Sequence, residues 1–280
     1  MFFGSKGGVN LRVIIAPRKY EGSGSLKNNT DDLNYIKNNF PDSDIYNLGD
    51  NSIIDFLDKH KICKKIKVMI NNPLFRVVES EYGLIEDDKI AIIELSKSSG
   101  MDMILEHEQN PMITSSYGTG EAIKDALDKG CRKFLISLRD TAAIDGGIGI
   151  LGALGMKFKD GNSDLVELTG KGMFDIEDID VGNLDPRAVE SEFVILTKSN
   201  TKLSGLKGSS YSYAMYKGAN KLMVVALDRG LRNYSLVIWK KFGIDIEHKE
   251  GAGAGGGIAG GLMTFLNCKF QRNVLVFKDK

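Results

Sequence analysis

Four segments near the start of the chain predict a β-α-β-α order. Residues 11–16 are apolar and β-branched and are closed by Pro17, a pattern typical of a buried strand. A helix, a second strand and a second helix are expected to follow, over residues 30–39, 44–48 and 51–60. In the last of these, Ile53, Ile54 and Leu57 share one helical face. The order predicts the beginning of a doubly wound α/β sheet.

The pattern changes after residue 66. Strands of an antiparallel or mixed sheet are expected over residues 67–70, 76–82 and 89–95, and further buried strands over residues 133–138 and 192–197. Helices are expected over residues 119–129, 146–154, 217–234 and 235–242. The first of these helices is the best defined, because apolar residues recur in it at helical spacing and Gly130 lies at its C-terminal end.

The composition is that of a globular protein without an obvious electrostatic partner. Hydrophobic residues make up 42% and charged residues 26% of the 280 residues, and 37 basic residues balance 37 acidic ones. A formal net charge of zero gives no reason to expect nucleic acid or an anionic membrane as a partner.

Cysteine and histidine usage points to a reducing compartment and to no metal site. The three cysteines lie far apart and the three histidines have no ligand spacing, so we expect neither a disulfide framework nor a bound metal. We therefore expect a cytoplasmic protein. No apolar run approaches the ~20 residues that span a bilayer, and residues 1–10 are too short and polar for a signal peptide.

Glycine clusters in three places, at residues 116–121, 145–149 and 251–261. A glycine-rich loop before a helix lets backbone N–H groups approach a phosphate, but glycine serves tight helix packing as readily. None of the three is a P-loop, because no Gly-Lys-Ser/Thr follows, and none is a dinucleotide fingerprint. The pattern by itself leaves both interpretations open.

Taken together, several motifs resemble the type-1 glycerate kinase family. They are Ile15-Ala16-Pro17, Asn110-Pro111 with Ser115-Ser116-Tyr117-Gly118-Thr119-Gly120-Glu121, Ile144-Asp145-Gly146-Gly147-Ile148-Gly149, Leu184-Asp185-Pro186-Arg187, Lys217-Gly218-Ala219 and the glycine run from Gly251. Each motif is weak by itself, but their order and approximate spacing match the family from residue 11 onward.

The resemblance implies a fold and a reaction. The family's enzymes move the γ-phosphoryl group of ATP onto glycerate with magnesium, in a cleft between a Rossmann-like domain and an inserted α/β domain. We accordingly predict a partial Rossmann- or flavodoxin-like domain with an N-terminal arm at residues 1–66 and a second α/β domain with a mixed sheet at residues 67–280. If the chain is active, the resemblance implies Asp145 as the metal-proximal or base carboxylate. It implies contacts to substrate or nucleotide at Ser116, Thr119, Gly120, Glu121, Gly146 and Gly147.

The chain departs from the family where charge is handled. The family's Asp-Ser-Phe-Lys-Glu-Ser becomes residues 18–23, with Arg18 in place of an acid and Glu21 in place of a lysine. Its Gly-Gly-Ser-Ala-Thr becomes residues 139–143, which begin with Arg139-Asp140, and Lys198 replaces an aspartate. Phosphoryl transfer depends on placed charges, so these changes are expected to remove catalysis.

Two functions therefore stand as hypotheses. The first is a pseudoenzyme without confident cofactors that self-associates in a structural or regulatory role; the second is an active glycerate kinase using ATP and magnesium. The chain ends at Lys280 where the family continues, so the sheet containing residues 11–16 and 44–48 is expected to lack half of its strands. An unpaired edge of this kind favours a homo-oligomer or filament, or a second chain that supplies the missing half.

Overall fold

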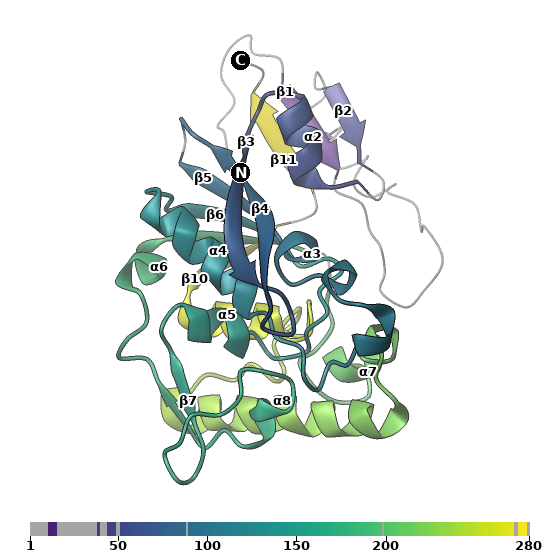
Figure 1. Cartoon of the computed structure of the whole chain (residues 1–280), viewed down its shortest axis with the longest axis vertical. Coiled ribbons are helices and arrows are strands. Elements are labelled where there is room, and N and C mark those ends of the chain that lie inside the picture. The colour runs from purple at the N-terminus through teal and green to yellow at the C-terminus, as the bar shows by residue number, and fades with distance from the viewer. Residues whose placement is uncertain are drawn as a thin grey trace.

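A computed structural model of the 280-residue chain describes residues 11–15, 38–39, 44–48, 51–87, 89–197, 199–271 and 274–278. A small sheet lies at one end of the molecule, and the long helix α8 (Lys221–Phe242) crosses the opposite end (Figure 1). The large sheet and its helices lie between them. The predicted N-terminal arm and most of the helix expected over residues 30–39 fall outside the described residues.

The large sheet has six strands in the order β10-β9-β6-β5-β4-β3. In chain order they are β3 (Lys64–Asn71), β4 (Val77–Ile85), β5 (Ile90–Glu94), β6 (Lys133–Ser137), β9 (Glu192–Leu196) and β10 (Asn267–Gln271). β10, β9, β6 and β5 run parallel, whereas β4 is antiparallel to both β5 and β3. The expected mixed sheet is confirmed.

Helices cover both faces of this sheet. The helices with defined bounds are α2 (Ile53–Lys59), α3 (Leu95–Ser98), α4 (Tyr117–Asp128), α5 (Ile148–Ala153), α6 (Pro186–Glu190), α7 (Ser209–Tyr213), α8 and α9 (Ile258–Phe265). Short 3-10 turns are η1 (Met101–Met103), η2 (Glu106–Glu108), η3 (Gly172–Phe174) and η4 (Met215–Lys217). A separate two-stranded sheet pairs β7 (Lys157–Lys159) with β8 (Asp178–Asp180).

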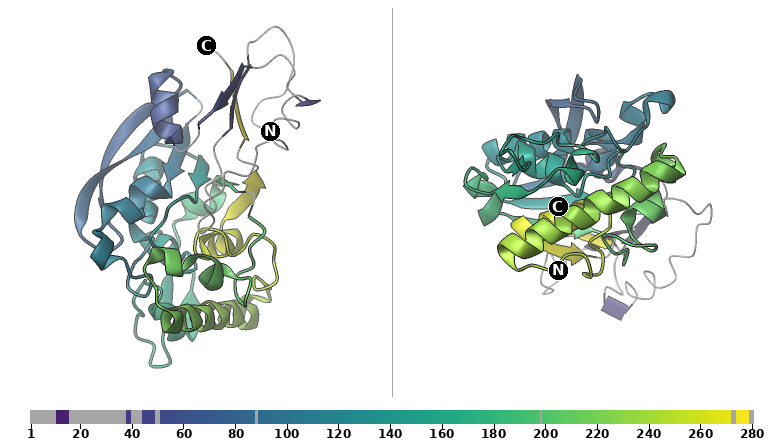
Figure 2. Two further views of the ribbon diagram at one scale, coloured as in Figure 1. Left: turned by 90° about the vertical axis from the view of Figure 1, so that its right-hand side faces the viewer. Right: turned by 90° about the horizontal axis from the view of Figure 1, so that it is seen from below.

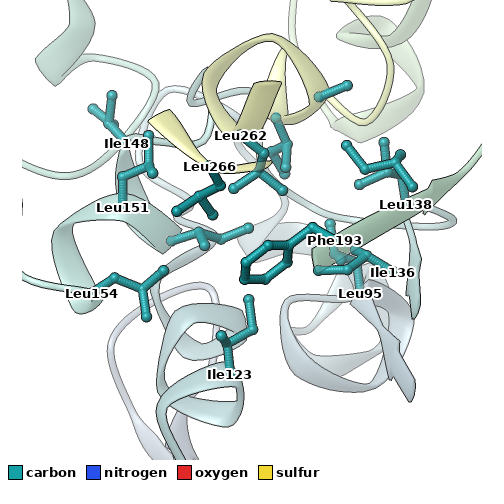
Figure 3. Close-up of a cluster of buried hydrophobic side chains, with 14 of the residues drawn as sticks. Leu95, Ile123, Ile136, Leu138, Ile148, Leu151, Leu154, Phe193, Leu262 and Leu266 are labelled. Atoms are coloured by element: carbon teal, nitrogen blue, oxygen red, sulfur yellow. The ribbon is translucent and has the colours of Figure 1, made fainter. Parts of the chain in front are cut away.

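The central strands read as continuous apolar runs because both of their faces are buried. In β6, Phe134 and Ile136 belong to the larger core, which α4, α5, α8 and α9 cover, while Leu135 belongs to a second core on the opposite face. Figure 3 shows the larger core, where Ile123 of α4, Leu151 of α5 and Leu262 of α9 converge with side chains of β6 and β9. This core fixes the helices whose N-terminal ends carry the family motifs.

The small sheet contains the two N-terminal strands that the sequence predicted, together with a strand from the C-terminal end of the described chain. Its order is β11-β1-β2, with β1 (Leu11–Ile15) between β2 (Asp44–Asn47) and β11 (Val274–Lys278). β2 pairs parallel to β1, and β11 pairs antiparallel to it. β1 therefore has a partner on each side, and β2 and β11 are the outer strands of this three-stranded sheet. The expectation that the sheet lacks half of its strands, and the assembly inferred from it, stay predictions. Figure 2 shows these strands at the end of the molecule remote from α8.

The two helices expected over residues 217–234 and 235–242 form a single helix in the structure. α8 is continuous from Lys221 to Phe242, and Lys217 lies before it in η4. Gly218 has a φ of 91°, which ends η4, and the side chain of Asn220 caps α8 by accepting a hydrogen bond from the N–H of Met223.

The architecture is a mixed α/β fold. The boundary predicted at residues 66 and 67 stays a prediction. None of the helices in the described ranges combines the length and the apolar character that a membrane span requires.

Candidate active site at the carboxyl edge of the parallel strands

The parallel strands β5, β6 and β9 end at the same edge of the large sheet, where α/β proteins bind ligands. The segment after β5 carries Ser98, the last residue of α3, and Ser99, while the loop after β6 carries Arg139, Asp140 and Thr141. The two loops are joined by backbone hydrogen bonds from Met101 to Asp140 and from Ala142 to Ser99, with N–O distances of 2.9 and 2.8 Å. The two segments are therefore held together at this edge.

Thr119 lies inside a hydroxyl network at this edge. Its Oγ1 is 2.7 Å from Oγ of Ser98 and 2.9 Å from Oγ of Ser99, and the Thr141 hydroxyl donates to the carbonyl of Ser99 at 3.2 Å. All four side chains are buried. The helix expected over residues 119–129 begins two residues earlier, at Tyr117, so Thr119 lies within the first turn of α4 and does not cap it. Its role as a ligand contact stays a prediction.

Asp145 joins the N-terminal ends of α4 and α5. One carboxylate oxygen, Oδ2, accepts hydrogen bonds from the backbone N–H and the hydroxyl of Ser116, both at 2.7 Å, and Oδ1 accepts from the N–H of Gly147 at 3.0 Å. Ser116 is the N-cap residue of α4, and its Oγ also accepts from the N–H of Ile150 at 3.2 Å. The pair therefore holds two helix ends together.

Burial raises the pKa of Asp145, and the hydrogen bonds from Ser116, Gly147 and Gly149 lower it without cancelling the rise. Its side chain is inaccessible to solvent. This geometry is that of a positioning residue, and the implied role of Asp145 as a base or metal-proximal carboxylate stays a prediction.

The remaining implied contacts also pack inside the protein. Glu121 accepts hydrogen bonds from the backbone N–H and the side-chain amide of Asn71, at 2.6 and 2.9 Å, which ties α4 to the end of β3. Gly146 and Gly147 have φ angles of 61° and 82°, and Gly147 is the N-cap residue of α5. A Cβ atom on Gly120 would lie 2.6 Å from the Cβ of Ala153. Packing accounts for these glycines here, and their contacts to nucleotide stay predictions.

Two cations at the edge were not among the implied site residues. Lys217 is 1% exposed, and its ammonium group donates to the carbonyl oxygen of Thr141. Arg139 follows β6 directly, and the exposed fraction of its side chain is 16%. The sequence signal for Lys217 was its place in the Lys217-Gly218-Ala219 motif. Lysine is almost never fully buried without a specific partner.

Several departures from the family cannot be placed. Arg18, Glu21 and Lys198 lie outside the described residues. Arg139 and Asp140 are described, and Asp140 has a φ of 52°, a backbone conformation that glycine adopts more easily. In the described part of the chain, no three acidic, histidine or cysteine side chains gather as a metal site.

A mixed α/β fold with polar loops gathered at the carboxyl edge of its parallel strands defines a class of ligand-binding α/β proteins. The model of the glycerate kinase family matches residues 13–279, and the chain belongs to that family.

Individual relatives agree with this assignment. A glycerate kinase of Haemophilus influenzae is 33% identical over 276 residues, which are 96% of this chain and 73% of the relative. A glycerate 2-kinase of Escherichia coli is 29% identical, over 94% of this chain and 71% of its own length. The crystal structure of a "putative glycerate kinase 2" from Salmonella typhimurium LT2 superposes with a TM-score of 0.77 at 28% identity, covering 93% of this chain and 71% of that one.

Proposed function

We propose that this protein is a kinase that transfers the γ-phosphoryl group of MgATP to glycerate. The observation that carries the proposal is the family match, which extends over residues 13–279 and therefore includes both the strands and the loops of the candidate site. In the reaction, a hydroxyl oxygen of glycerate attacks the γ-phosphorus, the bond from phosphorus to the departing ADP oxygen breaks, and the hydroxyl proton is released. We place this activity in the cytoplasm, in keeping with the free cysteines Cys63, Cys131 and Cys268.

The protein's contribution to such a transfer is positioning and charge neutralisation. The carboxyl edge supports both, since it combines buried hydroxyl groups with the cations of Arg139 and Lys217. Ser116 and Asp145 would act through the helix ends that they hold, and Gly120, Glu121, Gly146 and Gly147 through the packing of α4 and α5.

Magnesium enters this reaction as part of MgATP. The described residues contain no cluster of carboxylates that would hold the ion by themselves. Magnesium in such enzymes is usually bound by phosphate oxygens and water with one or two carboxylates. We assign it no protein ligand and derive no step through it.

A coupled assay of ADP release with D-glycerate and MgATP tests the proposal. We expect turnover in the range of about 1–100 per second that is typical of kinases, with phosphoglycerate identified by mass spectrometry. Omission of glycerate measures background ATP hydrolysis. A folded protein, checked by circular dichroism, that forms no phosphoglycerate would contradict the proposal.

A second candidate is the self-associating pseudoenzyme. It is favoured by Arg139 and Asp140 in place of a glycine pair and by the complete engagement of Asp145 with protein donors. This function predicts no turnover, no thermal shift with ATP or glycerate, and an assembly larger than a monomer. Light scattering at micromolar concentration tests the assembly, and a stable monomer would rule out self-association as the role.

A further inference from the structure

Arg139 occupies a fixed position at the carboxyl edge of the sheet. The residues on its C-terminal side are pinned to the loop after β5, because Met101 donates to the carbonyl of Asp140 and Gly100 forms a β-bridge with Thr141. On its N-terminal side, Leu138 is buried in the larger core. The backbone at Arg139 is therefore held on both sides.

The guanidinium group of Arg139 is incompletely satisfied. Its Nε is buried and has no hydrogen-bond partner among the residues that the structure describes. Its ion pair with Asp140 joins Nη2 to Oδ2 at 3.7 Å, which is longer than a hydrogen bond. A buried donor without a partner is costly, and such a group in a folded protein needs an explanation.

Three other arginines of the described chain donate hydrogen bonds to acceptors inside the protein. Arg187 binds Asp185 and Asp128 through Nε and both terminal nitrogens, and Arg76 forms two bonds to Glu108. Arg132, at the opposite end of β6, donates to the carbonyl oxygens of Leu127 and Cys131. Arg139 differs from these three arginines because it has a buried nitrogen without an acceptor among the described residues.

The geometry of the unused donors favours a carboxylate. The Nε–H and an Nη–H of a guanidinium group lie parallel, which matches the two oxygens of a carboxylate. Asp140 places a negative charge beside the same group, and repulsion grows in proportion to the charge of the ligand. A triphosphate is therefore disfavoured more strongly than a singly charged carboxylate.

We propose that Arg139 binds the carboxylate of the hydroxy acid substrate and determines specificity for it. The proposal rests on the function proposed above, whose phosphoryl acceptor is a hydroxy acid. Arg139 would hold the acid end of the acceptor, and the hydroxyl end would be left free to meet the nucleotide.

Calorimetry and kinetics of Arg139→Met test this assignment, with Arg132→Met as the matched control at the other end of the same strand. We expect Arg139→Met to weaken D-glycerate binding, and to raise its KM, by about 10- to 100-fold, while the KM for MgATP changes less than about twofold. Arg132→Met should leave both KM values near wild type. Arg139→Lys should bind D-glycerate more tightly than Arg139→Met and less tightly than wild type, because lysine keeps the positive charge but lacks the two parallel N–H donors of the guanidinium group.

Two further readouts separate a ligand-binding role from a structural one. Arg139→Met removes a buried unsatisfied donor, so its melting temperature should equal that of wild type or exceed it by up to about 2 °C. If Arg139 had a structural role, the melting temperature would fall. Wild-type protein should also bind D-glycerate at least about 10-fold more tightly than glyceramide, which lacks the carboxylate charge. This comparison needs no variant and holds even if Arg139→Met fails to fold.

The outcomes are distinguishable. Unchanged glycerate affinity in Arg139→Met, equal binding of glyceramide, or a rise confined to the KM for MgATP would overturn the assignment and leave the kinase activity standing. Glycerate binding that depends on Arg139 without any turnover would overturn the kinase proposal and support the assignment. Wild-type protein that neither binds nor phosphorylates glycerate would overturn both.

Discussion

At the scale of single residues, two buried carboxylates, those of Glu94 and Asp145, accept hydrogen bonds at the ends of helices. Glu94, at the end of β5, accepts hydrogen bonds from the N–H groups of Ile53 and Ile54 and from the hydroxyl of Ser52 at the start of α2. Asp145 does the same for α4 and α5. Negative charge is favourable at a helix N-terminus, where backbone N–H groups lack helical partners. Acidic residues in a kinase motif can therefore be retained for structure.

Replacing Asp145 with asparagine tests this structural role. An amide at this position presents N–H groups to N–H donors, so we expect Asp145→Asn to lower the free energy of unfolding by about 2–3 kcal/mol. Urea denaturation measures the loss. Asp102→Asn, a change at an exposed carboxylate, is the control and should stay within about 0.5 kcal/mol of wild type.

The pH dependence of the same comparison has a definite sign. Burial raises the pKa of Asp145, so the folded state binds a proton more readily than the unfolded state. Proton binding by Asp145 therefore stabilises the folded state. This stabilisation is fully present below the unfolded-state pKa of about 4, and it is lost as the pH rises through the folded-state pKa. The difference in unfolding free energy between wild type and Asp145→Asn should therefore become smaller as the pH rises. A difference that becomes larger would mean that the pKa of Asp145 is lowered in the folded protein.

At the scale of secondary structure elements, glycine allows two close approaches of different kinds. Gly120 lies in α4, and an added Cβ atom would lie 2.6 Å from both the Cβ of Ala153 and the carbonyl oxygen of Ile150 in α5. Gly130 follows α4 with a φ of 88°, and a Cβ atom there would meet nothing within 4 Å. Gly120 is required by the close contact between α4 and α5, whereas Gly130 is required by its left-handed backbone conformation.

Alanine substitutions should separate these causes. We expect Gly120→Ala to destabilise the protein by about 2–3 kcal/mol through overpacking, despite the better helix propensity of alanine. Gly130→Ala should cost only about 1 kcal/mol, because only the left-handed conformation is penalised. Thermal or urea unfolding of both variants gives the comparison, and an equal or larger loss at Gly130 would contradict it.

At the scale of the whole molecule, the two ends of the described chain meet in one sheet and one core. β11 pairs with β1, and Leu275 of β11 is 1% exposed. It packs in the second core with Leu48 and with Ile53, Ile54 and Leu57 of α2. This core also contains side chains of β5, β6 and β9, so it joins the small sheet to the large one.

Leu275→Ala tests the connection between the two sheets. We expect a loss of about 2–4 kcal/mol in unfolding free energy, since the substitution leaves a cavity among buried side chains. Hydrogen exchange should accelerate at residues 11–15 more than at residues 133–137, which lie in the centre of the large sheet. Leu206→Ala, at a leucine that is 82% exposed, is the control. Equal effects of the two variants would show that the C-terminal strand does not contribute to the fold.

The sequence predicted the elements whose signals are local. The strands β1, β5, β6 and β9 follow from short apolar runs of three or four residues. α4 follows from four apolar residues at helical spacing, all of which are buried: Ala122, Ile123, Ala126 and Leu127. The family membership followed from motifs spread over the chain, and the comparisons confirm it.

Pairing, burial and contact could only be decided by the tertiary structure, because they depend on residues far apart in the chain. Val274–Lys278 carries an apolar, β-branched pattern, but nothing in that pattern identifies β1, more than 250 residues earlier, as its partner. Likewise, the motif containing Asp145 does not reveal that Ser116 and Gly147 surround its carboxylate. The unsatisfied Nε of Arg139 depends on the neighbours that the folded loops supply. Local periodicity thus determined the elements, and long-range packing determined which of their polar groups remain for a ligand.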